Sequence, residues 1–208
     1  MTKNVLCFGD SNTWGAAPDG ARYGHDVRWP RRAQTILGDG YYLIEEGFCG
    51  RTCLIDDPVE GGHKSGGMYL PACLMSHTPL DLVVIMLGVN DTKSRFSLNA
   101  HTIAQSAGEL VKLCKIYAPE AKVLLVSPIL VGENLMETGM APIFGFEAIE
   151  KSKGFAIAYK HIADMHGAEF IDAAQYADPA IEDAIHMSKE NQLALADALA
   201  AKIKEILG

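Results

Sequence analysis

The sequence predicts an α/β fold, a three-layer αβα sandwich around a five-stranded parallel sheet in the order 2-1-3-4-5. Short apolar runs of strand length alternate along the chain with longer stretches whose apolar residues recur at helical spacing. A strand followed each time by a helix implies parallel pairing through right-handed crossovers. The flavodoxin-like order 2-1-3-4-5, with helices on both faces of the sheet, is the common solution for five such strands.

The predicted elements follow from these patterns. Ser188 is expected to cap the last helix, because its hydroxyl can accept from a free backbone N–H group of the first turn. A helix is expected to be irregular around Pro71. The predicted strands are residues 5–8, 42–45, 82–87, 123–127 and 169–172. Helices are predicted over residues 29–37, 68–77 and about 146–165. A further helix carries its apolar face from Ile103 to Tyr117, and the last helix begins after Ser188 and carries its apolar face from Leu195 to Ile206.

Length and charge limit the classes of protein to which this sequence can belong. The 208 residues fit a single domain, 1–208, which can bury roughly 70% of its unfolded surface without a metal or disulfide. The formal net charge of −8 argues against a nucleic-acid or anionic-membrane partner, because both need clustered Lys and Arg. No dinucleotide fingerprint, P-loop or HExxH motif is present, so neither a cofactor nor a metal is expected.

Cysteine usage and hydropathy predict a cytoplasmic protein. Five cysteines, an odd number with no CxxC pair, are typical of a reducing compartment. The longest apolar run, residues 82–89, is too short to span a bilayer. The first strand begins near residue 4, which leaves no room for a signal peptide.

Polar residues follow the two strands between which the predicted strand order reverses. The first strand ends in Gly9-Asp10-Ser11 and the third in Gly88-Val89-Asn90-Asp91. In open parallel sheets ligands bind beyond the carboxyl ends of the strands at this reversal. A hydroxyl and a carboxamide are therefore expected to meet there, joined by the flexible backbone of residues 46–52 after the second strand.

A serine hydroxyl is a weak nucleophile until a base takes its proton. Among seven histidines, His186 stands out because Asp183 precedes it by three residues, so one loop can present both groups. The connection from residue 173 to 187 spans roughly 50 Å when extended, against roughly 14 Å between the first and fifth strands. Each motif alone has an ordinary explanation as a turn or a helix cap, whereas their joint placement favours catalysis.

These residues resemble the four sequence blocks of the SGNH hydrolases, also called GDSL-type esterases. Phe8-Gly9-Asp10-Ser11 is similar to the nucleophile block, Gly50 to the block glycine, Gly88-Val89-Asn90-Asp91 to the asparagine block and Asp183-x-x-His186 to the acid–base block. Asp26-Val27-Arg28-Trp29, Ile55-Asp56-Asp57-Pro58 and Met86-Leu87-Gly88-Val89-Asn90-Asp91-Thr92-Lys93 resemble the bacterial arylesterase/acyltransferase branch.

The resemblance implies a role for each matching residue. Ser11 would be the nucleophile, His186 the general base and then acid, and Asp183 the residue that orients His186. The backbone N–H groups of Ser11 and Gly50 and the side-chain amide of Asn90 would form the oxyanion hole. Members of the branch hydrolyse small aryl and alkyl esters, some transfer acyl groups to alcohols or peroxide, and some form octamers. A small ester substrate and a homo-oligomer are therefore expected.

Further residues are expected to bind the substrate. They are Asn12, Trp14, Val89, Thr92 and Phe144. Asn12 departs from the branch, where an apolar residue follows the nucleophile. The long stretch 128–145, rich in Gly, Pro and Met, is expected to be either a functional lid or disordered. Phe144 and Phe146 are expected to close the entrance or to pack against a neighbouring subunit, in preference to packing within the loop itself. Arg51, Asp56 and Asp57 are interpreted as subunit contacts or solvated charges.

Two other functions stay open at this point. A carbohydrate acetylesterase of the same fold is the alternative substrate class, although the mostly apolar stretch 128–145 favours small hydrophobic esters. A non-catalytic receiver-like signalling domain is the alternative from another class, since Asp10, Asp91 and Ser127 fall where such domains carry polar residues. The lysine expected after the fifth strand is missing there, where Asp172 is followed by alanines.

Overall fold

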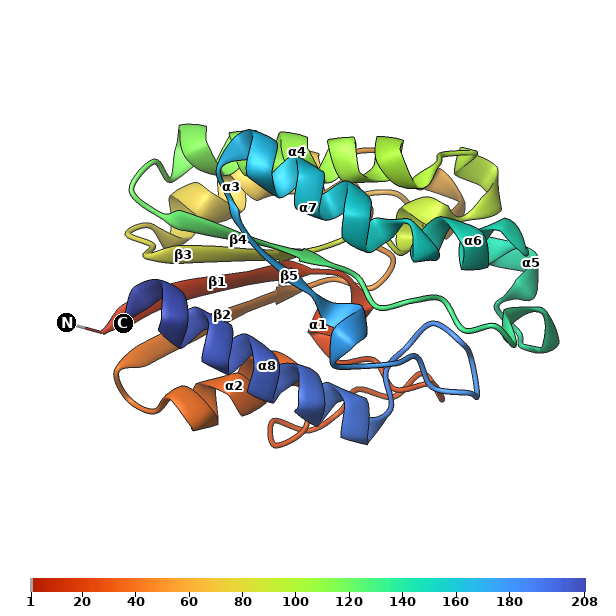
Figure 1. Cartoon of the computed structure of the whole chain (residues 1–208), viewed down its shortest axis with the longest axis horizontal. Helices are drawn as coiled ribbons and strands as arrows, with labels where there is room; N and C mark the ends of the chain where they lie inside the picture. The colour runs from red at the N-terminus through yellow and green to blue at the C-terminus, as the bar shows by residue number, and fades with distance from the viewer. Residues whose placement is uncertain (1) are drawn as a thin grey trace.

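Five parallel strands form one sheet in the order β2-β1-β3-β4-β5, so the predicted strand order is confirmed. The computed structural model describes residues 2–208, and Figure 1 shows the sheet between two layers of helices. Strand order reverses between β1 and β3, whose carboxyl ends lie beside α1 in Figure 1. The strands are β1 (Lys3–Gly9), β2 (Tyr41–Gly47), β3 (Leu82–Met86), β4 (Lys122–Ser127) and β5 (Glu169–Asp172).

Helices cover both faces of the sheet. One layer holds α3 (Gly66–His77), α4 (Ala100–Tyr117) and α7 (Phe155–His166), and the other holds α2 (Trp29–Leu37) and α8 (Lys189–Leu207) (Figure 1). Three short helices, α1 (Ser11–Trp14), α5 (Ala141–Phe144) and α6 (Glu147–Lys153), lie at the carboxyl ends of the strands. Among residues 2–208, no helix combines the length and the apolar character that crossing a bilayer requires.

The strand residues explain why the sheet is covered on both sides. In β1, Val5 and Cys7 pack into the apolar cluster beneath α2 and α8, whereas Leu6 and Phe8 pack into the cluster beneath α3, α4 and α7. All four side chains are fully buried. Successive residues of a strand face opposite sides, so a continuous apolar run demands a partner layer on each side.

The ends of two helices bear on the predictions. The predicted cap is confirmed, because the Ser188 hydroxyl accepts from the Asn191 N–H at the start of α8. The single helix predicted over 146–165 is wrong, since α6 and α7 are separate and meet at Gly154. A Cβ atom at Gly154 would lie 2.9 Å from the Ala100 Cβ, so this close approach to α4 needs glycine. Glycine in turn disfavours a continuous helix.

The stretch 128–145 is more regular than its composition suggests. It contains a 3₁₀ turn at Leu135–Glu137 and helix α5. Val131, Leu135 and Phe144 form an apolar cluster with α6 and with Ile185 of the last loop. This stretch is therefore packed as a wall beside the carboxyl ends of the strands.

Candidate active site

A tight turn joins β1 to α1 and presents Ser11. The Asp10 carboxylate accepts from the Asn12 N–H at 2.9 Å and so caps α1. A Cβ atom at Gly9 would lie 2.0 Å from the Thr13 Oγ1 and 2.9 Å from the Met86 carbonyl oxygen. Glycine is thus required for α1 to fold back over the strand tip, which places the Ser11 hydroxyl at the reversal point of the sheet.

A second turn, at residues 183–186, presents the histidine. One oxygen of the Asp183 carboxylate accepts from the backbone N–H groups of Ile185, at 2.9 Å, and His186, at 2.8 Å. Ala184 has φ +63°, a left-handed conformation that costs energy in a residue other than glycine. The Gly132 N–H, which donates to the Ala184 carbonyl at 2.8 Å, helps to hold this turn against the stretch 128–145.

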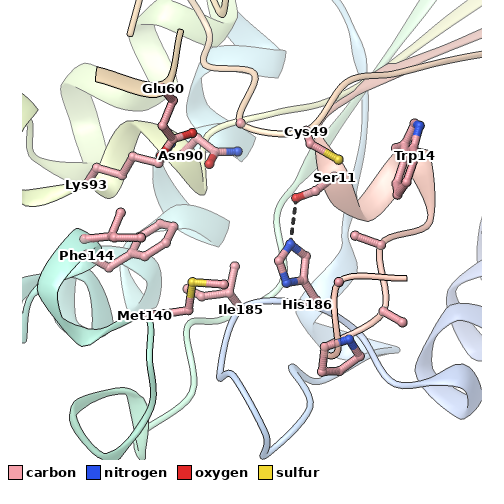
Figure 2. Close-up of a pocket in the computed structure, with 16 residues that line it drawn as sticks. Ser11, Trp14, Cys49, Glu60, Asn90, Lys93, Met140, Phe144, Ile185 and His186 are labelled. Carbon is pink, nitrogen blue, oxygen red and sulfur yellow. Dashed lines mark hydrogen bonds and ion pairs between the residues drawn. The ribbon is translucent and has the colours of Figure 1, made fainter. Parts of the chain in front are cut away.

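The two turns bring Ser11, His186 and Asp183 into one chain of hydrogen bonds. His186 Nε2 lies 3.0 Å from Ser11 Oγ, and His186 Nδ1 lies 2.5 Å from the second oxygen of Asp183 (Figure 2). A carboxylate on Nδ1 fixes the proton on that nitrogen, so Nε2 can accept the hydroxyl proton. Residues 175 positions apart in the sequence thus form a Ser–His–Asp arrangement.

Two buried carboxyl groups have shifted pKa values, that of Asp183 within this arrangement and that of Asp10 next to Ser11 in the sequence. Burial alone would raise the pKa of Asp183, but hydrogen bonds from the His186 ring and from the backbone of His186 and Ile185 lower it below the ordinary value. Asp183 is therefore held as a carboxylate. Burial raises the pKa of Asp10 to about 6, although the Asn12 N–H and the nearby charges of His186, Arg51 and Lys93 oppose the rise.

Three residues that line the same cavity, Ser11, Gly50 and Asn90, offer N–H donors there. The backbone N–H groups of Ser11 and Gly50 have no acceptor among residues 2–208. Gly50 adopts φ +79°, which a side chain would strain, and this conformation positions its peptide at the pocket. The Asn90 side chain donates one amide hydrogen to the Arg51 carbonyl at 3.1 Å, and its second hydrogen stays available. These donors fit the stabilisation of an oxyanion.

Arg51 and Asp57 are buried, which corrects their interpretation as subunit contacts or solvated charges. The Arg51 guanidinium donates to the Gly9 carbonyl at 2.8 Å and also to the Glu46 carbonyl. Asp57 is fully buried and pairs with Lys93 and Arg95. Asp56 alone of the three is exposed. Arg51 thus ties the ends of β1 and β2 to the peptide that holds Asn90.

A cavity of about 300 Å³ opens over Ser11 and His186. Apolar side chains form most of its wall, and Figure 2 shows Phe144, Met140 and Ile185 together on one side. The cavity is lined by Ser11, Trp14, Ala16, Ala17, Pro18, Gly20, Cys49, Gly50, Glu60, Asn90, Lys93, Met140, Ile143, Phe144, Ile185 and His186.

Glu60 and Lys93 give the cavity a charged side that sequence reasoning missed. Lys93 Nζ lies 2.7 Å from Glu60 and 3.3 Å from Asp57, and the lysine side chain is 2% exposed. Figure 2 shows the pair beside Asn90 and across the cavity from Trp14. Lys93 closes the motif that begins at Met86, so its position was a usable signal. Glu60 lies in a short 3₁₀ helix, Pro58–Glu60, which no pattern in the sequence indicates.

The residues expected to bind substrate separate into two groups. Trp14 and Phe144 line the cavity, and the Arg22 guanidinium stacks 4.7 Å from the centre of the Trp14 ring. Asn12, Val89 and Thr92 are buried elsewhere and do not belong to the lining. Val89 packs in the apolar cluster of α5 and α6, and the hydroxyl of Thr92 donates to the Val89 carbonyl at 2.6 Å.

Asn12 points away from the substrate for a clear reason. Its side chain donates to the Ile185 carbonyl at 3.2 Å and accepts from the Met187 N–H at 3.1 Å. The departure at this position therefore belongs to the support of the histidine turn and not to the polarity of the pocket. Phe146, expected at the entrance, is 61% exposed and lies outside the lining.

Comparison with known proteins decides the family. Residues 7–194 match the model of the GDSL-like lipase/acylhydrolase family. The chain belongs to this family. It is therefore an esterase of the GDSL/SGNH type, a carboxylic ester hydrolase, and its substrates are small-molecule esters. The resemblance to SGNH hydrolases is confirmed, and the receiver-like signalling domain is set aside.

Several known proteins are similar to this chain over nearly all of its length. The carbohydrate acetylesterase Est24 from Sinorhizobium meliloti is 38% identical, with 99% of this chain and 100% of that chain covered and a TM-score of 0.92. An inhibitor-bound aryl esterase of M. smegmatis is 36% identical, with the same coverage and a TM-score of 0.92. An acetylxylan esterase of Xylanibacter ruminicola is 29% identical over 96% of this chain, which spans 43% of that relative's length.

Proposed function

We propose that this esterase hydrolyses small acetyl-type esters of aryl and alkyl alcohols through an acyl-enzyme on Ser11. The observation that carries the proposal is the hydrogen-bond chain from Ser11 Oγ to His186 Nε2, at 3.0 Å, and from His186 Nδ1 to Asp183, at 2.5 Å. Nucleophile, base and orienting carboxylate are within hydrogen-bond reach without rearrangement.

The proposed reaction has two halves. Ser11 Oγ attacks the ester carbonyl carbon while His186 Nε2 takes the hydroxyl proton, and the carbonyl oxygen becomes an oxyanion among the donors of Ser11, Gly50 and Asn90. Collapse expels the alcohol, which receives its proton from His186, and leaves acyl-Ser11. Water then attacks the acyl group with His186 as base, and collapse releases the acid and restores the Ser11 hydroxyl.

The cavity favours a small substrate. Its volume of about 300 Å³ lies at the lower end of ligand pockets. Phe144, Met140 and Ile143 offer apolar contact to a short acyl group or an aromatic alcohol. Trp14 stands at the other side, where its ring can stack on an aryl leaving group (Figure 2).

Acyl transfer to alcohols or peroxide is part of the proposal. The acyl-enzyme is attacked by whichever nucleophile occupies the leaving-group side, and an apolar wall favours an alcohol over water there. Added alcohol is expected to divert acyl groups into a new ester, measured as the ratio of ester to free acid. Free acid as the sole product at high alcohol concentration would restrict the enzyme to hydrolysis.

Carbohydrate acetylesterase activity is the second candidate. Glu60 supports it, because one oxygen of its carboxylate is bound by Lys93 and Arg95 at 2.7 and 2.8 Å, while its side chain lines the cavity. A carboxylate can accept hydrogen bonds from sugar hydroxyls. If sugars are preferred, kcat/KM for acetylated xylosides exceeds that for phenyl acetate, and Glu60→Ala reduces only the former.

The whole chain is proposed to act as one catalytic unit in the cytoplasm and as a homo-oligomer, with an octamer suggested by the family resemblance. Ser11 and His186 come from the two ends of residues 1–208, which supports a single unit. All five cysteines are free, which fits a reducing compartment. Met68 and Ile157, 79% and 81% exposed, offer apolar contact surface. Sedimentation equilibrium, where a monomer mass would contradict association, tests the oligomer.

The direct test of the proposed reaction is replacement of Ser11. Ser11→Ala is expected to abolish hydrolysis of p-nitrophenyl acetate while the circular dichroism spectrum stays unchanged. Ser127→Ala, which removes a buried hydroxyl at the end of β4, is the matched control and should keep hydrolysis. Retained turnover in Ser11→Ala would contradict the acyl-enzyme.

A further inference from the structure

A second cluster of reactive side chains lies outside the esterase cavity. Glu46, near the carboxyl end of β2, meets Cys73 and His77 of α3. One ligand atom from each side chain, a carboxylate oxygen, the thiol sulfur and an imidazole nitrogen, lies within 4.8 Å of the other two. Among residues 2–208, this is the one group of three or more His, Cys, Asp and Glu side chains with such spacing.

The local structure explains why these residues converge. Cys73 and His77 are four positions apart on α3, so they lie one above the other on the same helix face. Successive residues of β2 face opposite sides of the sheet. Glu45 pairs with Arg28 on the α2 side, and Glu46 therefore points toward α3. His77 Nε2 lies 3.1 Å from one oxygen of Glu46.

We propose that Glu46, Cys73 and His77 form a zinc-binding site with water in the fourth position. Thiolate, imidazole and carboxylate are the three ligand types that Zn²⁺ takes in proteins, and three protein ligands leave one open position. The thiol proton leaves to solvent when the sulfur binds the metal.

The geometry needs only small side-chain movements. Zinc–ligand bonds of about 2.0–2.3 Å at tetrahedral angles place ligand atoms roughly 3.3–3.5 Å apart. Glu46 and His77 already stand 3.1 Å apart, and both side chains are partly exposed, at 19% and 31%. Rotation of these two side chains can bring the Glu46 oxygen and the His77 nitrogen closer to the buried Cys73 sulfur.

The surroundings orient the carboxylate and open a route for the ion. The Tyr69 hydroxyl donates to the second oxygen of Glu46 at 3.2 Å, an outer contact of the kind that fixes metal ligands. Glu46 and Tyr69 also line a cavity of about 510 Å³ through which an ion can enter. Arg51 shares this cavity and opposes a cation, while Asp56 in the same lining attracts one.

The site is separate from the proposed catalytic chemistry. Glu46, Cys73 and His77 do not line the cavity over Ser11. Zinc binding is therefore expected to survive Ser11→Ala, so failure of the zinc site and failure of the acyl-enzyme are distinguishable.

The test is metal binding by the purified full-length chain. After equilibration with micromolar Zn²⁺ and gel filtration, we expect one zinc per chain, and His77→Ala and Cys73→Ser should each bind at least tenfold more weakly. Tyr69→Phe should show a smaller loss. Cys49→Ser, which removes the thiol beside Ser11, is the matched control and should bind as the wild type does.

Cobalt provides a readout that depends on the sulfur. Co²⁺ should give a thiolate-to-metal charge-transfer band in the near ultraviolet that disappears in Cys73→Ser and remains in Cys49→Ser. Because His77 is partly exposed, His77→Ala keeps the test valid if Cys73→Ser fails to fold. Absence of stoichiometric zinc in the wild type, or unchanged affinity in His77→Ala, would overturn the proposal.

Discussion

Asn12 holds His186 in place by binding the backbone on both sides of it. The Asn12 amide donates to the Ile185 carbonyl at 3.2 Å and accepts from the Met187 N–H at 3.1 Å. Gln192 of α8 donates to the Asn12 carbonyl at 3.0 Å. The residue after Ser11 therefore fixes the distance between the hydroxyl and the imidazole.

Replacing Asn12 is expected to slow the chemical step. In Asn12→Ala, the turn that holds His186 loses two hydrogen bonds. We expect kcat to fall about 10- to 100-fold, because small displacements of reacting groups slow the chemical step by such factors. KM should change little, since Asn12 does not line the cavity. Steady-state kinetics measure both quantities. Asn99→Ala, which removes the cap of α4, is the control, and an unchanged kcat in Asn12→Ala would contradict the positioning role.

Replacing Asn90 tests the oxyanion hole. Asn90→Ala removes one of three donors, and kcat should drop about 10²–10³-fold. Asn134→Ala serves as the control, because that amide donates to the Ile181 carbonyl on the surface. A kcat within a factor of two of the wild type would show that Asn90 does not stabilise the transition state.

The buried charge pair of Lys93 is expected to matter for stability. Lys93→Met leaves Asp57, which is fully buried, with Arg95 at 2.7 Å as its remaining cation. The free energy of unfolding should fall by about 3 kcal/mol, the lower end for breaking a buried pair. Urea unfolding measures the loss.

The matched surface pair is Lys112 and Glu109, 2.6 Å apart with both side chains 50% exposed. Lys112→Met should change the free energy of unfolding by less than about 1 kcal/mol, because solvent screens exposed pairs. Equal losses for the two lysines would contradict the distinction between buried and exposed pairs.

Asp91 makes stability depend on pH. Burial raises its pKa to about 7 from an ordinary value of 3.8, and the charge of Asp10 adds to the rise even though the Cys53 N–H donates to the carboxylate. At a pH between these two pKa values, Asp91 binds more protons in the folded state than in the unfolded state. Its contribution to stability therefore falls as the pH rises from about 4 to about 7.

Asp91→Asn removes this titration. Relative to the variant, the wild type should lose stability by an amount on the order of a few kcal/mol as the pH rises from 4 to 8. Urea unfolding of both proteins across this range measures the difference. A difference that stays constant with pH would show that Asp91 does not titrate within it.

The fold was accessible from the sequence because local patterns and the global topology agree. Runs such as 5–8 are apolar at every position, and a sheet covered on both faces is the arrangement that buries them. The break at Gly154 was missed because it depends on the approach of Ala100, which no local pattern records.

The sequence predicts the site residues that directly follow a strand or that share one turn. Ser11 and Asn90 follow strands that the topology makes neighbours, and Asp183 lies in the same turn as His186. The sequence does not show in which direction a side chain points. For this reason Asn12 is predicted to contact substrate, although it faces the histidine turn. The sequence does not indicate Glu60 as a site residue, because only tertiary packing places it beside Lys93.

Ser11 is proposed to become covalently acylated, with His186 as its base. The most direct measurement is labelling with a fluorophosphonate probe followed by mass mapping of the modified peptide. We expect one adduct, on Ser11. Its rate of formation should fall strongly in His186→Ala and hardly at all in His101→Ala, since His101 lies on α4 outside the cavity lining. An adduct on another residue, or labelling of Ser11 at an unchanged rate in His186→Ala, would contradict it.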